Sequence, residues 1–166
     1  MAQVYVNTGL QNKDQRSETV TVETALTDTD GKVIRRASGK LSLKPGEKKT
    51  IRQQIEIKNP KLWSPDSPYL YRVQSRVKKG NQSIDGGITR IGIRQAEFRG
   101  KDGFWLNGKR FGQLVGANRH QDFAYVGNAL PNSQQWRDAK RLRDAGCTII
   151  RVAHYPQDPA FMDACD

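Results

Sequence analysis

The spacing of apolar residues changes near residue 95, and this change limits the fold more than any other feature of the chain. Before it, apolar and polar residues alternate, as they do from Val20 to Leu26. After it, short apolar runs are separated by a segment with helical spacing. Period two is typical of half-buried antiparallel strands, and alternating strands and helices are typical of parallel α/β units. We therefore predict two domains, residues 1–95 and residues 96–166.

Turn residues divide the first domain at regular intervals. Asp28–Gly31, Lys44–Gly46 and Lys79–Asn81 each place a glycine where the chain must reverse direction. The runs between such turns predict about seven strands, without any helical period. This pattern indicates an immunoglobulin-like β-sandwich.

A proline-rich segment, Asn59–Tyr71, interrupts the alternation with three prolines. Proline removes a ladder donor, so this segment should cross between strands as a loop. Trp63 within it could be a platform for stacking on a sugar. We expect it instead to be a buried anchor for the crossover.

The second domain begins with a hairpin signal, Asn107–Gly108, followed by a mostly apolar strand over 110–117 that ends at Asn118–His120. A second apolar run, Cys147–Val152, is suited to a strand covered on both faces. Between them lies a helical pattern long enough to connect two parallel strands.

The helical pattern begins at Asn132, a candidate cap with Gln135 three residues on, and stops at Gly146. Its apolar stripe includes Trp136, which we expect to lie in the core. A second helix should start at Asp158–Pro159, a cap followed by proline at the first helical position.

Polar side chains gather where the two predicted parallel strands end. Arg119, His120 and Asp122 follow the first strand, and the second delivers Arg151, His154 and Tyr155. In parallel α/β architectures the chemistry gathers at the carboxyl ends of the strands. Both histidines of the chain lie there, which favours a functional site.

Three alternatives apply to these residues. Each histidine could be a satisfied packing residue, and Arg151 could form an ion pair at the start of a helix. A set of His120, Asp122 and His154 could also hold a metal ion, because two histidines and a carboxylate form a known open ligand set. The spacing of these three residues in the sequence is not specific to metal sites and gives the metal alternative little support. We therefore predict neither a metal nor another cofactor.

The net charge of +11 is concentrated in the first domain. Residues 1–95 contain 18 Lys/Arg against 9 Asp/Glu, whereas residues 96–166 contain 10 against 8. The basic residues are dispersed and lack the interleaved aromatics of a single-strand binding surface, so we expect no nucleic-acid partner. They form either a solvated sandwich face or a contact for an acidic polysaccharide or an acidic neighbouring domain.

Other features of composition exclude further classes. No stretch approaches the roughly 20 apolar residues of a membrane span, so we expect no membrane partner, and the amino terminus lacks the apolar core of a secretion signal. The cellular compartment is therefore unknown. Two cysteines are too few to predict a disulfide framework.

Three blocks of the chain resemble glycoside hydrolase family 2, which contains β-galactosidases, β-glucuronidases and β-mannosidases. They are Ile150–Pro156 with Phe161 and Cys165–Asp166 in step; Leu114–His120; and the sandwich segments Leu62–Pro65, Leu70–Tyr71 and Gly92–Arg94. Thr148 and Val152 depart from the family's usual residues. The resemblance covers roughly residues 20–166 and implies an immunoglobulin-like β-sandwich followed by the first β/α units of a truncated (β/α)8 barrel.

The resemblance also implies roles for individual residues. Arg151 matches an arginine beside the nucleophile carboxylate, where a positive charge keeps that carboxylate ionised. His120 and His154 match histidines that contact the substrate sugar. Asn118 would support them, and Arg119 and Asp122 are further supporting candidates at the same strand end.

The predicted function is that of part of a retaining β-glycosidase that hydrolyses terminal β-linked sugars, in particular a β-galactosidase. The resemblance places both catalytic glutamates in later barrel strands, so the chain alone should be inactive and no catalytic residue is assigned within it. The alternative is a non-catalytic β-sandwich that binds carbohydrate or a protein partner. Two barrel units without the remainder should also expose an apolar edge through which the chain could self-associate.

Overall fold

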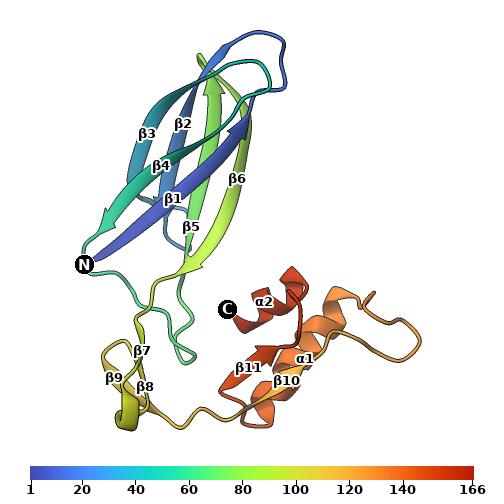
Figure 1. The fold of residues 1–166 in the computed structure, drawn as a ribbon. Coiled ribbons are helices and arrows are strands. Elements are labelled where there is room, and N and C mark those ends of the chain that lie inside the picture. Colours follow the sequence, from blue (N-terminus) through green and yellow to red (C-terminus); the bar gives the residue numbers. More distant parts are fainter. The chain divides into compact units, whose positions relative to one another are not determined.

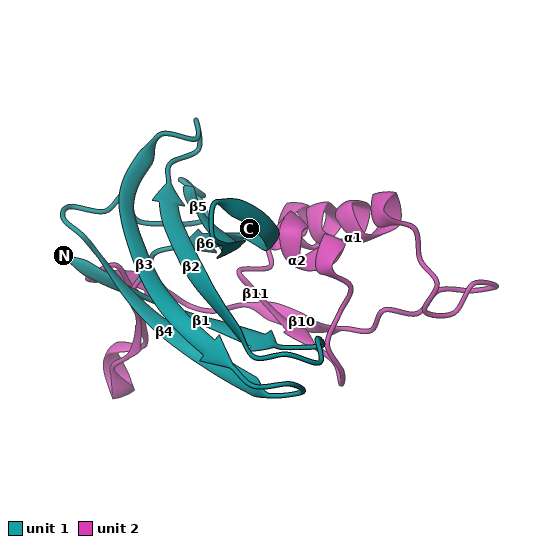
Figure 2. Ribbon diagram, turned by 90° about the horizontal axis from the view of Figure 1, so that it is seen from above, with its two compact units in different colours: residues 1–94 teal, residues 95–166 magenta.

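The computed structural model describes residues 1–166 as two compact units, Met1–Arg94 and Gln95–Asp166 (Figure 2). The first unit contains strands only (Figure 1). Their bounds are β1 Ala2–Gln11, β2 Glu18–Thr27, β3 Val33–Leu43, β4 Lys48–Ile57, β5 Leu70–Lys79 and β6 Gln82–Gly92. The prediction of about seven strands is thus one too high for this unit, while the predicted sandwich is confirmed.

The six strands form two antiparallel sheets. One pairs β1 with β4, and the other has the order β3-β2-β5-β6. The predicted turns connect successive strands. Their glycines, Gly31, Gly46 and Gly80, all have positive φ, at 84°, 72° and 59°. Glycine adopts this conformation without a Cβ clash, which is why these positions reverse the chain.

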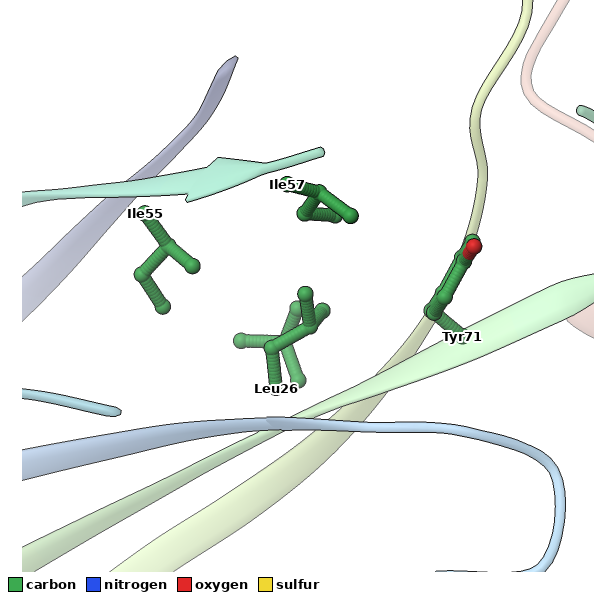
Figure 3. Packing of buried hydrophobic residues seen from close by; sticks show 5 residues of the cluster. Leu26, Ile55, Ile57 and Tyr71 are labelled. Carbon is green, nitrogen blue, oxygen red and sulfur yellow. The ribbon is translucent and has the colours of Figure 1, made fainter. Parts of the chain in front are cut away.

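Alternating side chains from both sheets form the core of the sandwich. Leu26 from β2, Ile55 and Ile57 from β4, and Tyr71 and Val73 from β5 make up its main cluster (Figure 3). Each is at most 6% exposed. Full burial of such side chains contributes roughly 1.5–3 kcal/mol each, so this cluster is a major source of the unit's stability.

A polar bridge crosses the same core. Thr24 on β2 donates from Oγ1 to Gln53 Oε1 at 2.6 Å, and Gln53 Nε2 donates to the Val22 carbonyl at 3.1 Å. Thr24 and Gln53 are 1% and 7% exposed. Buried polar groups are tolerated when their hydrogen bonds are made, and this bridge satisfies that requirement between the two sheets.

The crossover around Trp63 packs on the end of β6. The Trp63 backbone N–H donates to the Ile93 carbonyl at 2.8 Å, and the Arg94 guanidinium lies 4.8 Å from the centre of the Trp63 ring. A Cβ on Gly92 would lie 3.0 Å from the Trp63 side chain, so glycine allows the close approach. Trp63 is only half-buried, so the expected burial is incomplete, but these contacts support the role of an anchor.

The second unit contains short strands and two α-helices. Their bounds are β7 Ala96–Phe98, β8 Phe104–Leu106, β9 Lys109–Gly112, β10 Gly116–Arg119, α1 Asn132–Asp144, β11 Ile149–Val152 and α2 Pro159–Cys165, with a 3₁₀ turn at Gly100–Asp102. Strands β7, β8 and β9 form an antiparallel sheet, and β10 pairs with β11 in parallel. Neither α-helix is long and apolar enough to cross a membrane.

Local predictions for the second unit are partly confirmed. Asn107 and Gly108 form the β8–β9 hairpin with φ of 53° and 76°. The single strand expected over 110–117 is wrong, because that run is divided between antiparallel β9 and parallel β10. The division falls at Gly112, whose φ of 103° breaks the extended conformation.

The predicted N-cap is confirmed for α2 but not for α1. Asp158 caps α2 by accepting a hydrogen bond from the Ala160 N–H at 2.8 Å, as predicted. The predicted cap of α1 is wrong, since Pro131 is the N-cap and Asn132 is already helical. Trp136 is 53% exposed rather than in the core, because nothing in the unit covers that face of α1.

Candidate functional site

The site lies at the carboxyl ends of β10 and β11. In the parallel register, Gly116 lies opposite Ile149, and Asn118 lies opposite Arg151. A Cβ on Gly116 would lie 1.8 Å from the Ile149 carbonyl oxygen, so only glycine fits at this pairing. The glycine thus sets the start of the strand pair, and both strands end at the same edge.

Four side chains meet at that edge and form the strand-end cluster: Asn118, His120, Arg151 and His154. Arg151 Nη1 lies 3.5 Å from Asn118 Oδ1 and 3.2 Å from His154 Nδ1. The rings of His120 and His154 are 5.2 Å apart between centroids and nearly perpendicular, at 79°. All four residues are exposed, so a ligand in solution can reach them.

The contact between Arg151 and His154 defines the roles of the histidine nitrogens. A guanidinium can only donate hydrogen bonds, so Nδ1 of His154 must accept. The proton of the neutral imidazole is then on Nε2, which becomes a donor. The cluster therefore combines a fixed positive charge with groups that can bond hydroxyls.

Arg119 points away from this cluster into the unit. Its Nη2 donates to Gln135 Oε1 at 2.7 Å and to Asp138 Oδ2 at 2.9 Å, its Nη1 donates to Gln157 Oε1, and its guanidinium lies 4.0 Å from the centre of the Phe161 ring. Only 6% of Arg119 is exposed. It therefore links β10 to both helices instead of facing a ligand.

The two loops that follow the strands are joined by Gln121, which sequence reasoning did not single out. Its backbone N–H donates to Tyr155 Oη at 3.0 Å, and its Oε1 accepts from the Asp158 N–H at 2.5 Å. Its place between two candidate residues, His120 and Asp122, was the only available signal. Gln121 holds the loops that carry both histidines.

Asp122 is exposed, and no contact joins it to the strand-end cluster. Nowhere in residues 1–166 do three His, Cys, Asp or Glu side chains lie close enough together to hold a metal ion. The set His120, Asp122 and His154 is therefore not assembled as the metal alternative requires.

Three carboxylates on or beside the helices are engaged elsewhere. Asp138 pairs with Arg119, Asp144 lies 2.6 Å from Lys140 Nζ, and Asp158 caps α2. None of these three is directed to the strand-end cluster. They serve the stability of the helices.

The thiol of Cys165 at the end of α2 is not poised as a nucleophile. Partial burial raises its pKa, the nearby Asp166 charge raises it further, and Arg119 opposes both effects. A raised pKa leaves the thiol protonated near neutral pH, and the thiolate is the reactive form.

Comparison with known proteins gives matches over nearly the whole chain. Residues 1–94 match the family described as "Glycosyl hydrolases family 2", and residues 98–166 match "Glycosyl hydrolases family 2, TIM barrel domain". A β-galactosidase of Thermoanaerobacter pseudethanolicus is 44% identical over 119 residues, which are 71% of this chain and 16% of that protein. A β-glucuronidase of Bacteroides fragilis is 36% identical over 157 residues, 93% of this chain and 22% of that protein.

Comparison with solved structures also finds members of this family. A crystal structure of Bacteroides uniformis β-glucuronidase superimposes with a TM-score of 0.91 at 29% identity, covering 99% of this chain and 20% of that chain. The chain thus spans about a fifth or less of the length of these relatives.

Proposed function

Because the chain belongs to glycosyl hydrolase family 2, we propose that it contributes the strand-end cluster to the sugar-binding site of a retaining β-glycosidase. The observation that carries this proposal is the convergence of Arg151, His154, His120 and Asn118 at the carboxyl ends of two parallel strands. That edge is where α/β barrels collect their catalytic and binding groups.

Each member of the cluster has a role in this proposal. Retaining hydrolysis uses a carboxylate nucleophile and a carboxylic acid about 5–5.5 Å apart. Arg151 keeps the nucleophile ionised through its positive charge, and Asn118 orients the guanidinium. His154, with Nε2 as donor, and His120 bond hydroxyl groups of the sugar.

For the substrate, we propose a terminal β-galactoside. The β-galactosidase of Thermoanaerobacter pseudethanolicus, at 44% identity, supports this choice. A β-glucuronide is the competing substrate, supported by the β-glucuronidase of Bacteroides fragilis and the structural similarity to that of Bacteroides uniformis.

The test uses the full-length protein that contains this chain. It should hydrolyse an aryl β-galactoside with retention of configuration, and His154→Ala should lower kcat/KM about 10- to 100-fold, because a hydrogen bond to the substrate is lost. Arg137→Ala, an exposed change on α1, should leave kcat/KM within about twofold. If kcat/KM is higher on the matching β-glucuronide, the β-glucuronide becomes the proposed substrate in place of the β-galactoside. If His154→Ala leaves kcat/KM unchanged, the proposed role of the cluster is refuted.

We also propose that the 166-residue chain has no hydrolytic activity of its own. Asp138 and Asp144 are engaged in salt bridges and Asp158 in a helix cap, which supports this view. Hydrolysis of the aryl galactoside by the purified chain above a matched blank would contradict it.

A further inference from the structure

The outer face of the four-stranded sheet in the first unit contains a recess with an excess of positive charge. This face lies opposite the one on which Val22, Leu26 and Val73 pack into the core. The recess has a volume of about 300 Å³. Its lining includes Glu23 and Ala25 from β2, Arg36 and Ser38 from β3, and Gln74 and Arg76 from β5.

The strand register explains why the sheet is hollow there. Ala25 on β2 lies between Arg36 on β3 and Gln74 on β5, because both pair with it. Side chains stand roughly perpendicular to a sheet, so a methyl group between two long side chains leaves a depression. In the neighbouring row, Glu23 lies between Ser38 and Arg76.

The two arginines at this recess lack partners. Arg36 and Arg76 are exposed, and neither guanidinium makes an ion pair or a hydrogen bond within the chain. The one carboxylate in the lining, Glu23, is 3.2 Å from Lys78 Nζ, which balances its charge. The recess therefore presents uncompensated positive charge, which Arg72 on the same strand as Arg76 extends.

The chemistry of the lining selects among anionic ligands. The planar guanidinium matches a carboxylate with two parallel hydrogen bonds. Gln74 and Ser38 add groups that both donate and accept, as hydroxyl groups require. The lining contains no aromatic side chain, whereas single-stranded nucleic acids bind on stacked aromatics.

We propose that this recess binds a carboxylate-bearing polysaccharide, with Arg36 and Arg76 holding a uronate carboxylate and with Gln74 and Ser38 bonding adjacent hydroxyls. This site is separate from the strand-end cluster, which lies in the other unit. It does not depend on the proposed hydrolysis. The sandwich thereby acts as a carbohydrate-binding surface in its own right.

The test is calorimetric titration of the 166-residue chain with an oligogalacturonate, using its methyl-esterified form as the neutral probe. The oligogalacturonate should bind, and its methyl ester should bind at least tenfold more weakly. Arg36→Gln/Arg76→Gln should weaken binding of the oligogalacturonate at least tenfold. Arg52→Gln/Lys58→Gln removes the same charge from exposed positions on and just after β4 and should weaken it no more than about twofold.

A third variant separates recognition by the recess from general attraction. Arg36→Lys/Arg76→Lys keeps the charge but removes the planar fork, and it should bind at least threefold more weakly than the unaltered chain. The proposal would be overturned if Arg36→Gln/Arg76→Gln and Arg52→Gln/Lys58→Gln weakened binding of the oligogalacturonate equally. It would also be overturned if Arg36→Lys/Arg76→Lys bound as tightly as the unaltered chain. Tighter binding of dextran sulfate or of an oligothymidylate than of the oligogalacturonate would also overturn it. Circular dichroism should show all variants folded, since none of these side chains has a partner to lose.

Discussion

Arg119 and Arg151 have opposite environments although they lie on adjacent strands. Arg151 is exposed within the strand-end cluster, whereas Arg119 is 6% exposed and bonds to two side chains of α1 and to Gln157 in the loop before α2. Successive side chains of a strand point to opposite faces, and the register places Arg151 opposite Asn118, one residue before Arg119. One face of this strand pair therefore carries the strand-end cluster, and the other packs against the helices.

The buried network makes Arg119→Met a severe change. It would leave Asp138 without its cation and would leave Gln135 and Gln157, which already have unpaired Nε2 atoms, without their acceptor bonds. Breaking a buried pair on one side costs about 3–5 kcal/mol, and we expect a loss of about 3 kcal/mol because Asp138 is partly exposed.

Hydrogen exchange of the α1 amides would measure this loss. Arg137→Met on the same helix is the control, since Arg137 is exposed and has no partner, and it should change the stability by less than about 0.5 kcal/mol. Similar exchange in both variants would contradict the structural role of Arg119.

At the scale of elements, the parallel pair β10–β11 depends on Gly116. A Cβ there would overlap the backbone of Ile149, which cannot move without separating the strands. We expect Gly116→Ala to destabilise the pair by about 3 kcal/mol or more, at the upper end of overpacking costs.

Exchange of the β10 and β11 amides would report this effect. Gly87→Ala on β6 is a suitable comparison, because a Cβ at Gly87 meets no atom within 4 Å. That variant should be unchanged or up to about 1 kcal/mol more stable, since alanine restricts the unfolded chain. Intact protection of the two strands in Gly116→Ala would mean that the close approach is not required.

The turn between β3 and β4 should make the stability of the sandwich sensitive to acid. Glu47 accepts a hydrogen bond from the Lys44 N–H at 2.8 Å and lies 3.0 Å from Lys49 Nζ, and these contacts lower its pKa. A carboxylate with a lowered pKa in the folded state stabilises that state above its unfolded pKa, and this contribution is lost as the pH falls through the folded pKa.

Glu47→Gln should therefore unfold at a lower temperature than the unaltered chain at pH 7, and this difference should disappear as the pH falls through the lowered pKa of Glu47. Thermal unfolding at several pH values would measure it. Because the residue is on the surface, a small gap is expected, and a gap that widens in acid would contradict the assignment.

At the scale of the whole molecule, the two units differ in core size. Both hydrophobic clusters, including Leu26 and Val77, belong to the first unit. In the second unit the buried apolar residues are few and include small ones: Leu106, Leu130, Ala153, Ala160 and Phe161.

Two unfolding transitions are therefore expected, with residues 95–166 unfolding at the lower denaturant concentration. Amide exchange along a urea series would resolve them. A single transition shared by all amides would show that the units unfold together.

The second unit also exposes apolar side chains on β11 and on its helices: Ile149, Val152, Trp136 and Met162. Such surfaces and unpaired strand edges promote association. We expect the 166-residue chain to self-associate as its concentration rises, as light scattering would measure. A monomer at all concentrations would contradict this expectation.

The sequence by itself determined the features that depend on neighbouring residues. The turn at Asp28–Gly31, the hairpin at Asn107–Gly108 and the cap at Asp158 follow from local backbone preferences. Period-two alternation determined the sandwich, and the strand–helix order placed the candidate residues at the ends of parallel strands.

Only the tertiary structure decided which partner each side chain meets. Gln135 has the spacing of a helix cap, yet it is fully buried against Arg119, and Trp136 has the spacing of a core residue, yet it is exposed. Likewise, the recess at Ala25 exists because three strands bring Arg36 and Gln74 to either side of it. Local periodicity determines which side chains share a face of a helix or strand. The groups opposite that face come from distant segments of the chain, and only their contacts determine whether a side chain is buried and whether its charge is paired.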